Sequence, residues 1–90
     1  MIKHTGNSQI DGLNAIAMDV AKHQDHNFGV LSTGEKVYVA LASNRMDLLQ
    51  SMRYTIAEAL ARLGPEWVNA LIYSWQYAGN PANYEPESLK

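Results

Sequence analysis

The stretch Phe28–Leu41, FGVLSTGEKVYVAL, decides the fold class that this sequence predicts. In its second half, Val37, Val39 and Leu41 alternate with residues assigned to the opposite face, which is the period-two pattern of a half-buried strand. Gly34 lies between the two apolar runs and can adopt the positive φ of a tight turn. We therefore expect a two-stranded antiparallel hairpin over 28–41.

A helix is expected on the N-terminal side of this hairpin. Ser8 is the expected N-cap, and the helix is expected to end near residues 22–23. Its apolar residues recur at three- and four-residue steps, which places them on one face: Ile10, Leu13, Ile16, Ala17 and Val20.

Helical patterning resumes after the hairpin, with Asn44 as the expected N-cap. The segment 45–63 is either one helix or two, and the poor helix formers Tyr54 and Thr55 favour a break followed by a Thr55–Glu58 capping box. Gly64-Pro65 then ends one helix and opens the last, over 66–77.

The predicted order is helix, strand, strand, helix, helix (αββαα). This is a small α+β domain over 1–78, with helices packed on one face of the hairpin. Residues 79–90 contain two prolines and no apolar periodicity, so we expect them to form an extended C-terminal tail.

Composition narrows the class of protein. The chain has 90 residues, 47% of them hydrophobic, a net charge of −2 and no cysteine. One domain of this size has little volume for a deep catalytic cleft, and the lack of cysteine excludes disulfide frameworks and thiolate zinc sites. No run of ~18 apolar residues predicts a membrane span. With an N-terminus unlike a signal peptide, these features predict a cytoplasmic protein.

The polar residues predict neither an enzyme nor a cofactor. Carboxylates and serines are scattered, whereas acid–base catalysis needs two positioned groups in a dry cleft. His23 and His26, with Asp25 between them, are candidate metal ligands, but a site needs three or four converging ligands and His4 is remote in sequence. We expect a solvated helix end there.

The two helices joined at Gly64-Pro65 have the outline of a helix-turn-helix over 55–75. This makes a nucleic-acid-associated regulator the alternative function. A recognition helix needs donors for base edges and cations for phosphates, yet the second helix contains no lysine or arginine. Nucleic acid is therefore not the expected partner; the alternative would depend on Arg45, Arg53 and Arg62.

Aromatic residues are concentrated near the C-terminus. The last helix carries no charge after Glu66 and is apolar or aromatic on nearly all sides. Such a helix is either central in its own core or buried against another chain, and a fold of this size has little material to surround it. We expect an interface. Its predicted partner-binding residues are Trp67, Tyr73, Trp75 and Tyr77, followed by Tyr38 and Tyr54.

Two stretches, STGEKVYVALASNR over 32–45 and TIAEALARLGPEW over 55–67, resemble short uncharacterised proteins of temperate phages and prophages. The resemblance covers residues 8–84 and carries no catalytic signature. It implies an accessory protein that binds and modulates a host protein by stoichiometric contact. Together with the aromatic helix, it leads us to expect a protein-binding module, self-associating as a homodimer and engaging a host protein.

Overall fold

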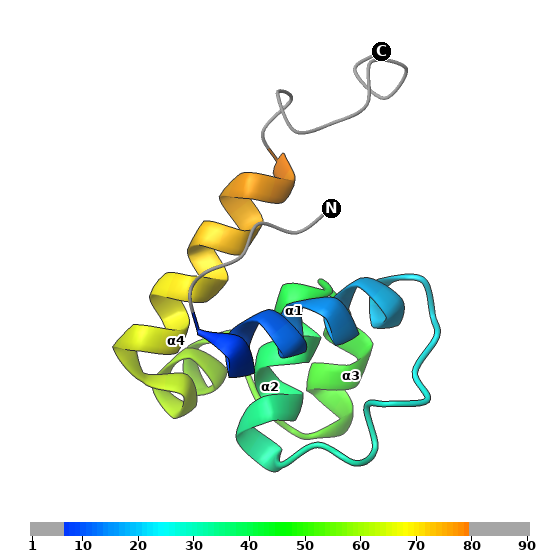
Figure 1. Ribbon diagram of the computed structural model, residues 1–90. Helices are drawn as coiled ribbons and strands as arrows, with labels where there is room; N and C mark the ends of the chain where they lie inside the picture. Colours follow the sequence, from blue (N-terminus) through cyan, green and yellow to red (C-terminus); the bar gives the residue numbers. More distant parts are fainter. Residues whose placement is uncertain (1–6, 80–90) are drawn as a thin grey trace.

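The computed structural model describes residues 7–79, with side chains described over 7–76. Four helices follow one another: α1 (Ser8–Ala21), α2 (Thr33–Ala42), α3 (Met46–Ser51) and α4 (Ile56–Gly79). No strand occurs in the described part of the chain, so the predicted α+β class with a hairpin over 28–41 is wrong. The fold is all-helical (Figure 1).

Helix α2 replaces the second predicted strand because its N-terminus is held by a capping box. The Glu35 backbone N–H donates to Ser32 Oγ at 3.3 Å, and the Ser32 N–H donates to the Glu35 carboxylate at 2.9 Å. These bonds satisfy donors that a helix start leaves free. They also lower the pKa of Glu35, with the Ser32 backbone donor as the largest cause. The expected turn at Gly34 is thus the first turn of a helix.

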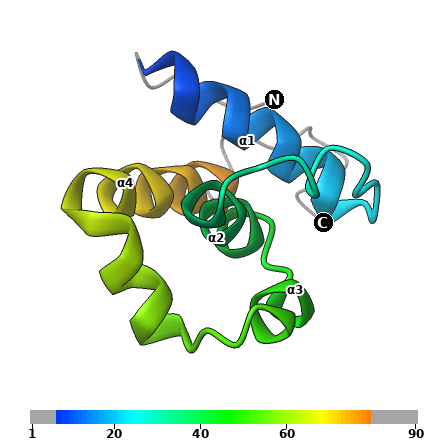
Figure 2. The ribbon, with the colours of Figure 1, turned by 90° about the horizontal axis from the view of Figure 1, so that it is seen from below.

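The alternation that suggested a strand has another origin. All five residues from Val37 to Leu41 are fully buried, so neither half of the alternating pattern faces solvent. Helix α2 lies in the middle of the fold and packs against α1, α3 and α4, as Figure 2 shows. A helix enclosed on several sides needs no polar stripe, and periodicity then cannot separate it from a strand.

Helix α1 matches its prediction closely. Its N-cap is Asn7 rather than Ser8, and the Asn7 side chain accepts bonds from the backbone N–H groups of Gln9 and Ile10. Its predicted apolar face is turned to the core, with Ile16 half-buried at the margin and the others buried: Ile10, Leu13, Ala17 and Val20.

Three helices end in the same way. The residues that follow α1, α2 and α3 include His23, Asn44 and Arg53, each in the left-handed region with φ of 61–64°. After α2, for example, the Asn44 N–H donates to the Leu41 carbonyl and the Arg45 N–H donates to the Ala40 carbonyl. This is a Schellman ending. Asn44 therefore ends a helix instead of capping the next one as expected.

The breaks predicted in the C-terminal half are confirmed. The chain leaves α3 at Ser51 and enters α4 at Ile56, with Thr55 and Glu58 forming the expected capping box. Within α4, Gly64 has φ 81° and ψ 168°, so α4 consists of two helical halves joined at Gly64-Pro65. The predicted tail over 79–90 begins at the last residue of α4 and otherwise lies outside the described residues.

Candidate protein-binding surface

The second half of α4 is anchored to α2 along one side. Leu71 is fully buried, and the half-buried Trp67 ring meets the Tyr38 ring edge-on, with centroids 5.6 Å apart and an interplanar angle of 83°. This T-shaped contact is a favoured arrangement for aromatic pairs. The left-handed Gly64 directs the second half of α4 onto α2, because its backbone conformation changes the direction of the chain.

The other sides of this half-helix carry large apolar side chains that remain accessible. Ile72, Tyr73 and Trp75 are 43%, 41% and 37% exposed, with Tyr73 on the side of the helix opposite Trp75 at 100° per residue, and we refer to these three residues together as the α4 surface. The sequence from Trp67 to Gln76 contains no charged residue. Figure 1 shows the end of α4 extending away from α1, α2 and α3. An accessible, uncharged apolar surface of this kind is typical of protein-binding sites.

Trp75 is exposed and yet fixed in orientation. Its indole Nε1–H donates a hydrogen bond of 3.1 Å to the carbonyl of Leu41, near the C-terminal end of α2. The bond satisfies the one polar group of the indole and restricts its rotamers. The ring is therefore presented in one orientation, which lowers the entropic cost of binding against it.

The structure separates the predicted partner-binding residues into two groups. Tyr73 and Trp75 lie on the α4 surface, whereas Tyr38 is fully buried and Trp67 and Tyr54 are half-buried against the core. A partner cannot reach Tyr38, so its expected binding role is not retained. Tyr77 follows residue 76, the last residue whose side chain the structure describes.

Ile72 was not predicted as a binding residue, although the sequence contains a signal for it. It follows Val68 by four residues and precedes Trp75 by three, which places the three residues along one side of a helix. Which side of α4 packs on α2 decides that Ile72 is exposed while Leu71 is buried.

Tyr38 instead belongs to a buried polar pair. Its hydroxyl donates to Asn14 Oδ1 at 2.8 Å, and the two residues are 0% and 1% exposed. Burial raises the pKa of Tyr38 to about 12, partly offset by the bond to Asn14. The Asn14 Nδ2 group is buried without a hydrogen-bond partner. The pair links α1 to α2 and has no access to a substrate.

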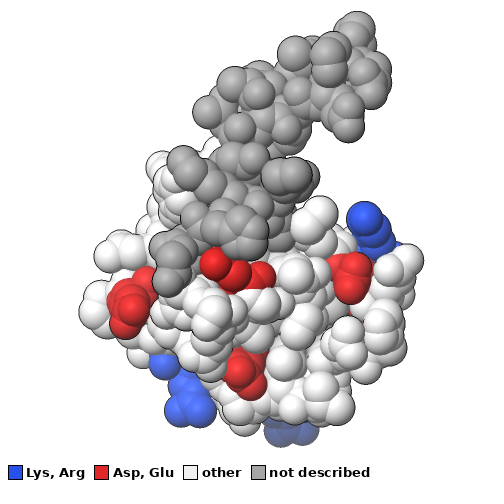
Figure 3. All heavy atoms as spheres, viewed as in Figure 1, with Lys and Arg blue, Asp and Glu red and all other residues white. Residues whose placement is uncertain are grey.

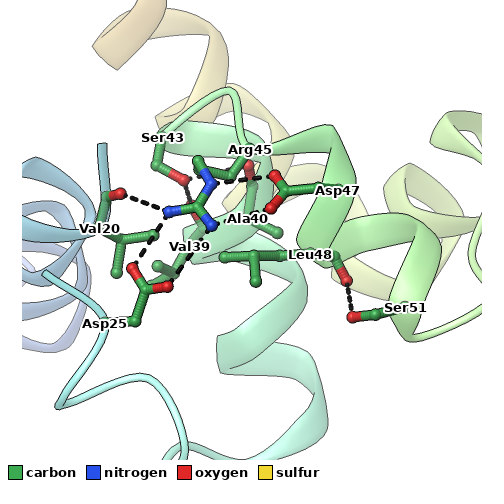
Figure 4. Close-up of polar contacts among 9 residues, drawn as sticks. All are labelled: Val20, Asp25, Val39, Ala40, Ser43, Arg45, Asp47, Leu48 and Ser51. Atoms are coloured by element: carbon green, nitrogen blue, oxygen red, sulfur yellow. Dashed lines mark hydrogen bonds and ion pairs between the residues drawn. The ribbon is translucent and has the colours of Figure 1, made fainter. Parts of the chain in front are cut away.

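Arg45 forms the main charged cluster (Figure 4). Its Nη1 donates to the Val20 carbonyl at 2.9 Å and to Asp25 at 3.1 Å, while Nε and Nη2 donate to Asp47 at 2.9 and 2.8 Å. The Arg45 bonds lower the pKa of Asp47 to about 2. The cluster connects the end of α1, the following loop and the start of α3, which is a structural role.

This arrangement weakens the nucleic-acid alternative. The Arg45 side chain is only 12% exposed and is paired with two carboxylates, so it is not available for phosphates. Arg62 is the one lysine or arginine between residues 55 and 75. On the face shown in Figure 3, basic and acidic side chains are dispersed among uncharged ones, rather than gathered in the basic patch typical of nucleic-acid binding.

The candidate metal ligands do not converge. Over the described residues, no group of three or more histidine, aspartate or glutamate side chains is placed to hold a metal ion. Asp25 is bound to Arg45, and His23 provides the left-handed residue after α1. His4 lies outside the described residues.

Comparison with known proteins adds no assignment. The chain matches no protein-family model, no curated protein and no solved structure. In the part of the chain that the structure describes, no helix combines the length and apolar character needed to cross a bilayer.

Proposed function

We propose that this protein is a non-enzymatic protein-binding module whose contact site is the α4 surface. The observation that carries the proposal is the exposure of Ile72, Tyr73 and Trp75 on a stretch of helix without charged residues. Tryptophan and tyrosine are enriched among residues that dominate binding energies, because they bury a large area with few rotatable bonds.

The partner in this proposal is a protein of a bacterial host, contacted in the cytoplasm. The resemblance of residues 8–84 to short phage and prophage proteins supports this choice, since it implies stoichiometric contact with a host factor. The absence of cysteine is consistent with a reducing compartment.

The test compares capture by matched variants of the full chain. Wild-type protein and a Tyr73→Ala/Trp75→Ala variant are immobilised at equal density and exposed to host lysate, and captured proteins are identified by mass spectrometry. Ile56→Ala is the control, because Ile56 is 53% exposed but lies in the first half of α4. Circular dichroism and thermal unfolding verify that each variant is folded.

We expect a protein captured by the wild type and by Ile56→Ala but lost with the double variant. Calorimetry with that protein in purified form should then show at least a tenfold weaker affinity for the double variant, about 1.4 kcal/mol. Equal capture by all three chains, or no specific capture, would contradict the proposal.

A further inference from the structure

We propose that Gly64 is a two-position hinge in α4, and that the segment after it exchanges places with the same segment of a second copy of this chain. In the exchanged dimer, the second half of α4 from each copy packs on α2 of the other copy. The inference is independent of the proposed function, because it concerns the contacts between α4 and α2 rather than the exposed side chains of α4.

The hinge is a single residue whose two backbone angles differ in freedom. Gly64 has φ 81° and ψ 168°. Pro65 holds ψ of Gly64 at an extended value, because a proline ring clashes with a helical residue before it. Pro65 therefore opposes the straightening of α4 into one continuous helix. Rotation about φ is not restricted in this way, since glycine adopts positive and negative φ about equally readily.

The sign of φ at Gly64 decides where the second half of α4 points. Figure 2 shows the two halves of α4 meeting at a sharp angle, with the second half beside α2. An extended residue with negative φ has a φ of about −75°, so the change from 81° is a rotation of about 155° about the N–Cα bond. Such a rotation carries the whole second half of α4 away from α2 of its own copy.

The second half of α4 is held mainly through α2. Leu71 is fully buried, and the Trp67 ring packs edge-on against the Tyr38 ring. The Trp75 indole donates to the Leu41 carbonyl of α2. Helix α4 as a whole packs chiefly on α2, with a smaller contact to α1. A rotation at Gly64 therefore releases the segment as a unit and does not require α1, α2 or α3 to unfold.

The structure also shows what covers the vacated side of α2. If the segment were released alone, the Leu71 side chain and the Tyr38 ring would be exposed to water, which disfavours an open monomer. The same segment of a second copy carries the same Trp67, Leu71 and Trp75, so it restores these contacts. Exchange of an identical element is a low-cost route to a dimer for this reason.

Glycine at position 64 keeps the closed monomer accessible. The monomer is favoured at low concentration, because closing within one chain loses none of the translational freedom that association loses. A side chain at position 64 disfavours positive φ with extended ψ, and negative φ remains open to it. Nothing lies within 4 Å of a Cβ added to Gly64, so alanine there acts through the backbone angles alone. Gly64→Ala should therefore shift the equilibrium from the monomer to the exchanged dimer.

The first test is sedimentation velocity on the full chain, from about 5 to about 500 µM. At the lowest concentration the wild type should sediment as a 10.0 kDa monomer. Gly64→Ala should dimerise with a dissociation constant at least about tenfold lower than that of the wild type. Gly12→Ala is the matched control and should behave as the wild type. A Cβ added to Gly12 also meets nothing within 4 Å, but Gly12 lies inside α1 and has no positive φ.

The second test identifies the exchange itself. Isotope-labelled and unlabelled Gly64→Ala chains are unfolded in urea, mixed in equal amounts and refolded together. Isotope-filtered NMR then records only contacts between a labelled and an unlabelled chain. The Trp67 and Tyr38 rings, whose centroids are 5.6 Å apart in the closed structure, should give contacts between chains. A dimer without these interchain ring contacts would overturn the exchange.

The wild type supplies a test that does not depend on the folding of a variant. Both signs of φ are available to Gly64, so refolding from urea at about 500 µM should give a dimer fraction, whereas refolding at about 5 µM should give monomer alone. That dimer should show the same ring contacts between labelled and unlabelled chains.

Each outcome decides the inference. It fails if Gly64→Ala is folded by circular dichroism and remains monomeric at every concentration. It also fails if Gly12→Ala dimerises as strongly as Gly64→Ala. If Gly64→Ala does not fold, the wild type decides, and monomer alone after refolding at both concentrations overturns the inference.

Discussion

The buried pair of Tyr38 and Asn14 allows a quantitative test of the core. Tyr38→Phe removes only the hydroxyl and leaves the ring that packs edge-on against Trp67. The Asn14 Oδ1 atom then loses its 2.8 Å donor at a site that is 1% exposed, where water cannot replace it. Leaving a buried polar group unsatisfied costs about 1–3 kcal/mol. For a domain of this size, the melting temperature should fall by about 5–20 °C.

Thermal and urea unfolding, followed by far-UV circular dichroism, measure this loss. Asn14→Leu should also destabilise the protein, because the Tyr38 hydroxyl is then unsatisfied. The double variant should lose less than the sum of the two single losses, by at least about 1 kcal/mol, since it removes both polar partners. It also removes the Asn14 Nδ2 group, which is buried without a partner. A Tyr38→Phe loss below about 0.5 kcal/mol, with additive single effects, would refute this reasoning.

The same hydroxyl predicts a loss of stability in alkali. Burial raises the pKa of Tyr38 to about 12 from its ordinary value of 10. A group with a raised pKa in the folded state contributes full stability below its unfolded pKa. That contribution should therefore decline as the pH rises from 10 through about 12. Unfolding curves for Tyr38→Phe should show a weaker decline over this interval than those of the wild type.

Three further predictions concern the backbone and the charged cluster. Arg53 adopts a left-handed conformation with φ 64°, so Arg53→Gly should raise the free energy of unfolding by about 0.5–1 kcal/mol. Asn44→Gly should raise the free energy of unfolding by less, because asparagine tolerates the left-handed region. Equal effects of the two variants in urea unfolding would contradict this. Gly64→Ala should cost about 1–3 kcal/mol, although nothing lies within 4 Å of the added Cβ, because φ 81° with ψ 168° is accessible essentially to glycine alone. Arg45 lowers the pKa of Asp47 from 3.8 to about 2. The pair should therefore contribute stability above pH 3.8, and this contribution should be lost as the pH falls through about 2. The melting temperature of Asp47→Asn should depend less on acid pH than that of the wild type.

The sequence predictions that the structure confirms depend on local interactions between neighbouring residues. The apolar face of α1, the capping box at Thr55 and Glu58, and the change of direction at Gly64-Pro65 depend on residues within a few positions of one another. A second capping box, at Ser32 and Glu35, is equally local and favours a helix. The alternation in the residues that follow it favours a strand, and the prediction followed the alternation.

Local sequence features do not predict which aromatic residues of α4 are accessible to a partner. The concentration of tyrosine and tryptophan in the last helix was evident from the sequence, as was the lack of charge after Glu66. The contact with Tyr38 turns Trp67 towards the core, while Tyr73 and Trp75 remain exposed. Which of these residues faces a neighbour depends on how α4 rotates about its axis to pack on α2, and a uniformly apolar helix carries no pattern that specifies this rotation.

The sequence by itself determined the amphipathic helix α1, the break before the Thr55–Glu58 capping box, the change of direction at Gly64-Pro65 and the segment rich in aromatic residues, because these features depend on neighbouring residues. Tertiary structure decided how the segment 33–42 is buried and that Ile72, Tyr73 and Trp75 remain accessible. The physical reason is burial: Val37–Leu41 are enclosed by α1, α3 and α4, and a segment enclosed on several sides has no solvent-facing residues to reveal its period.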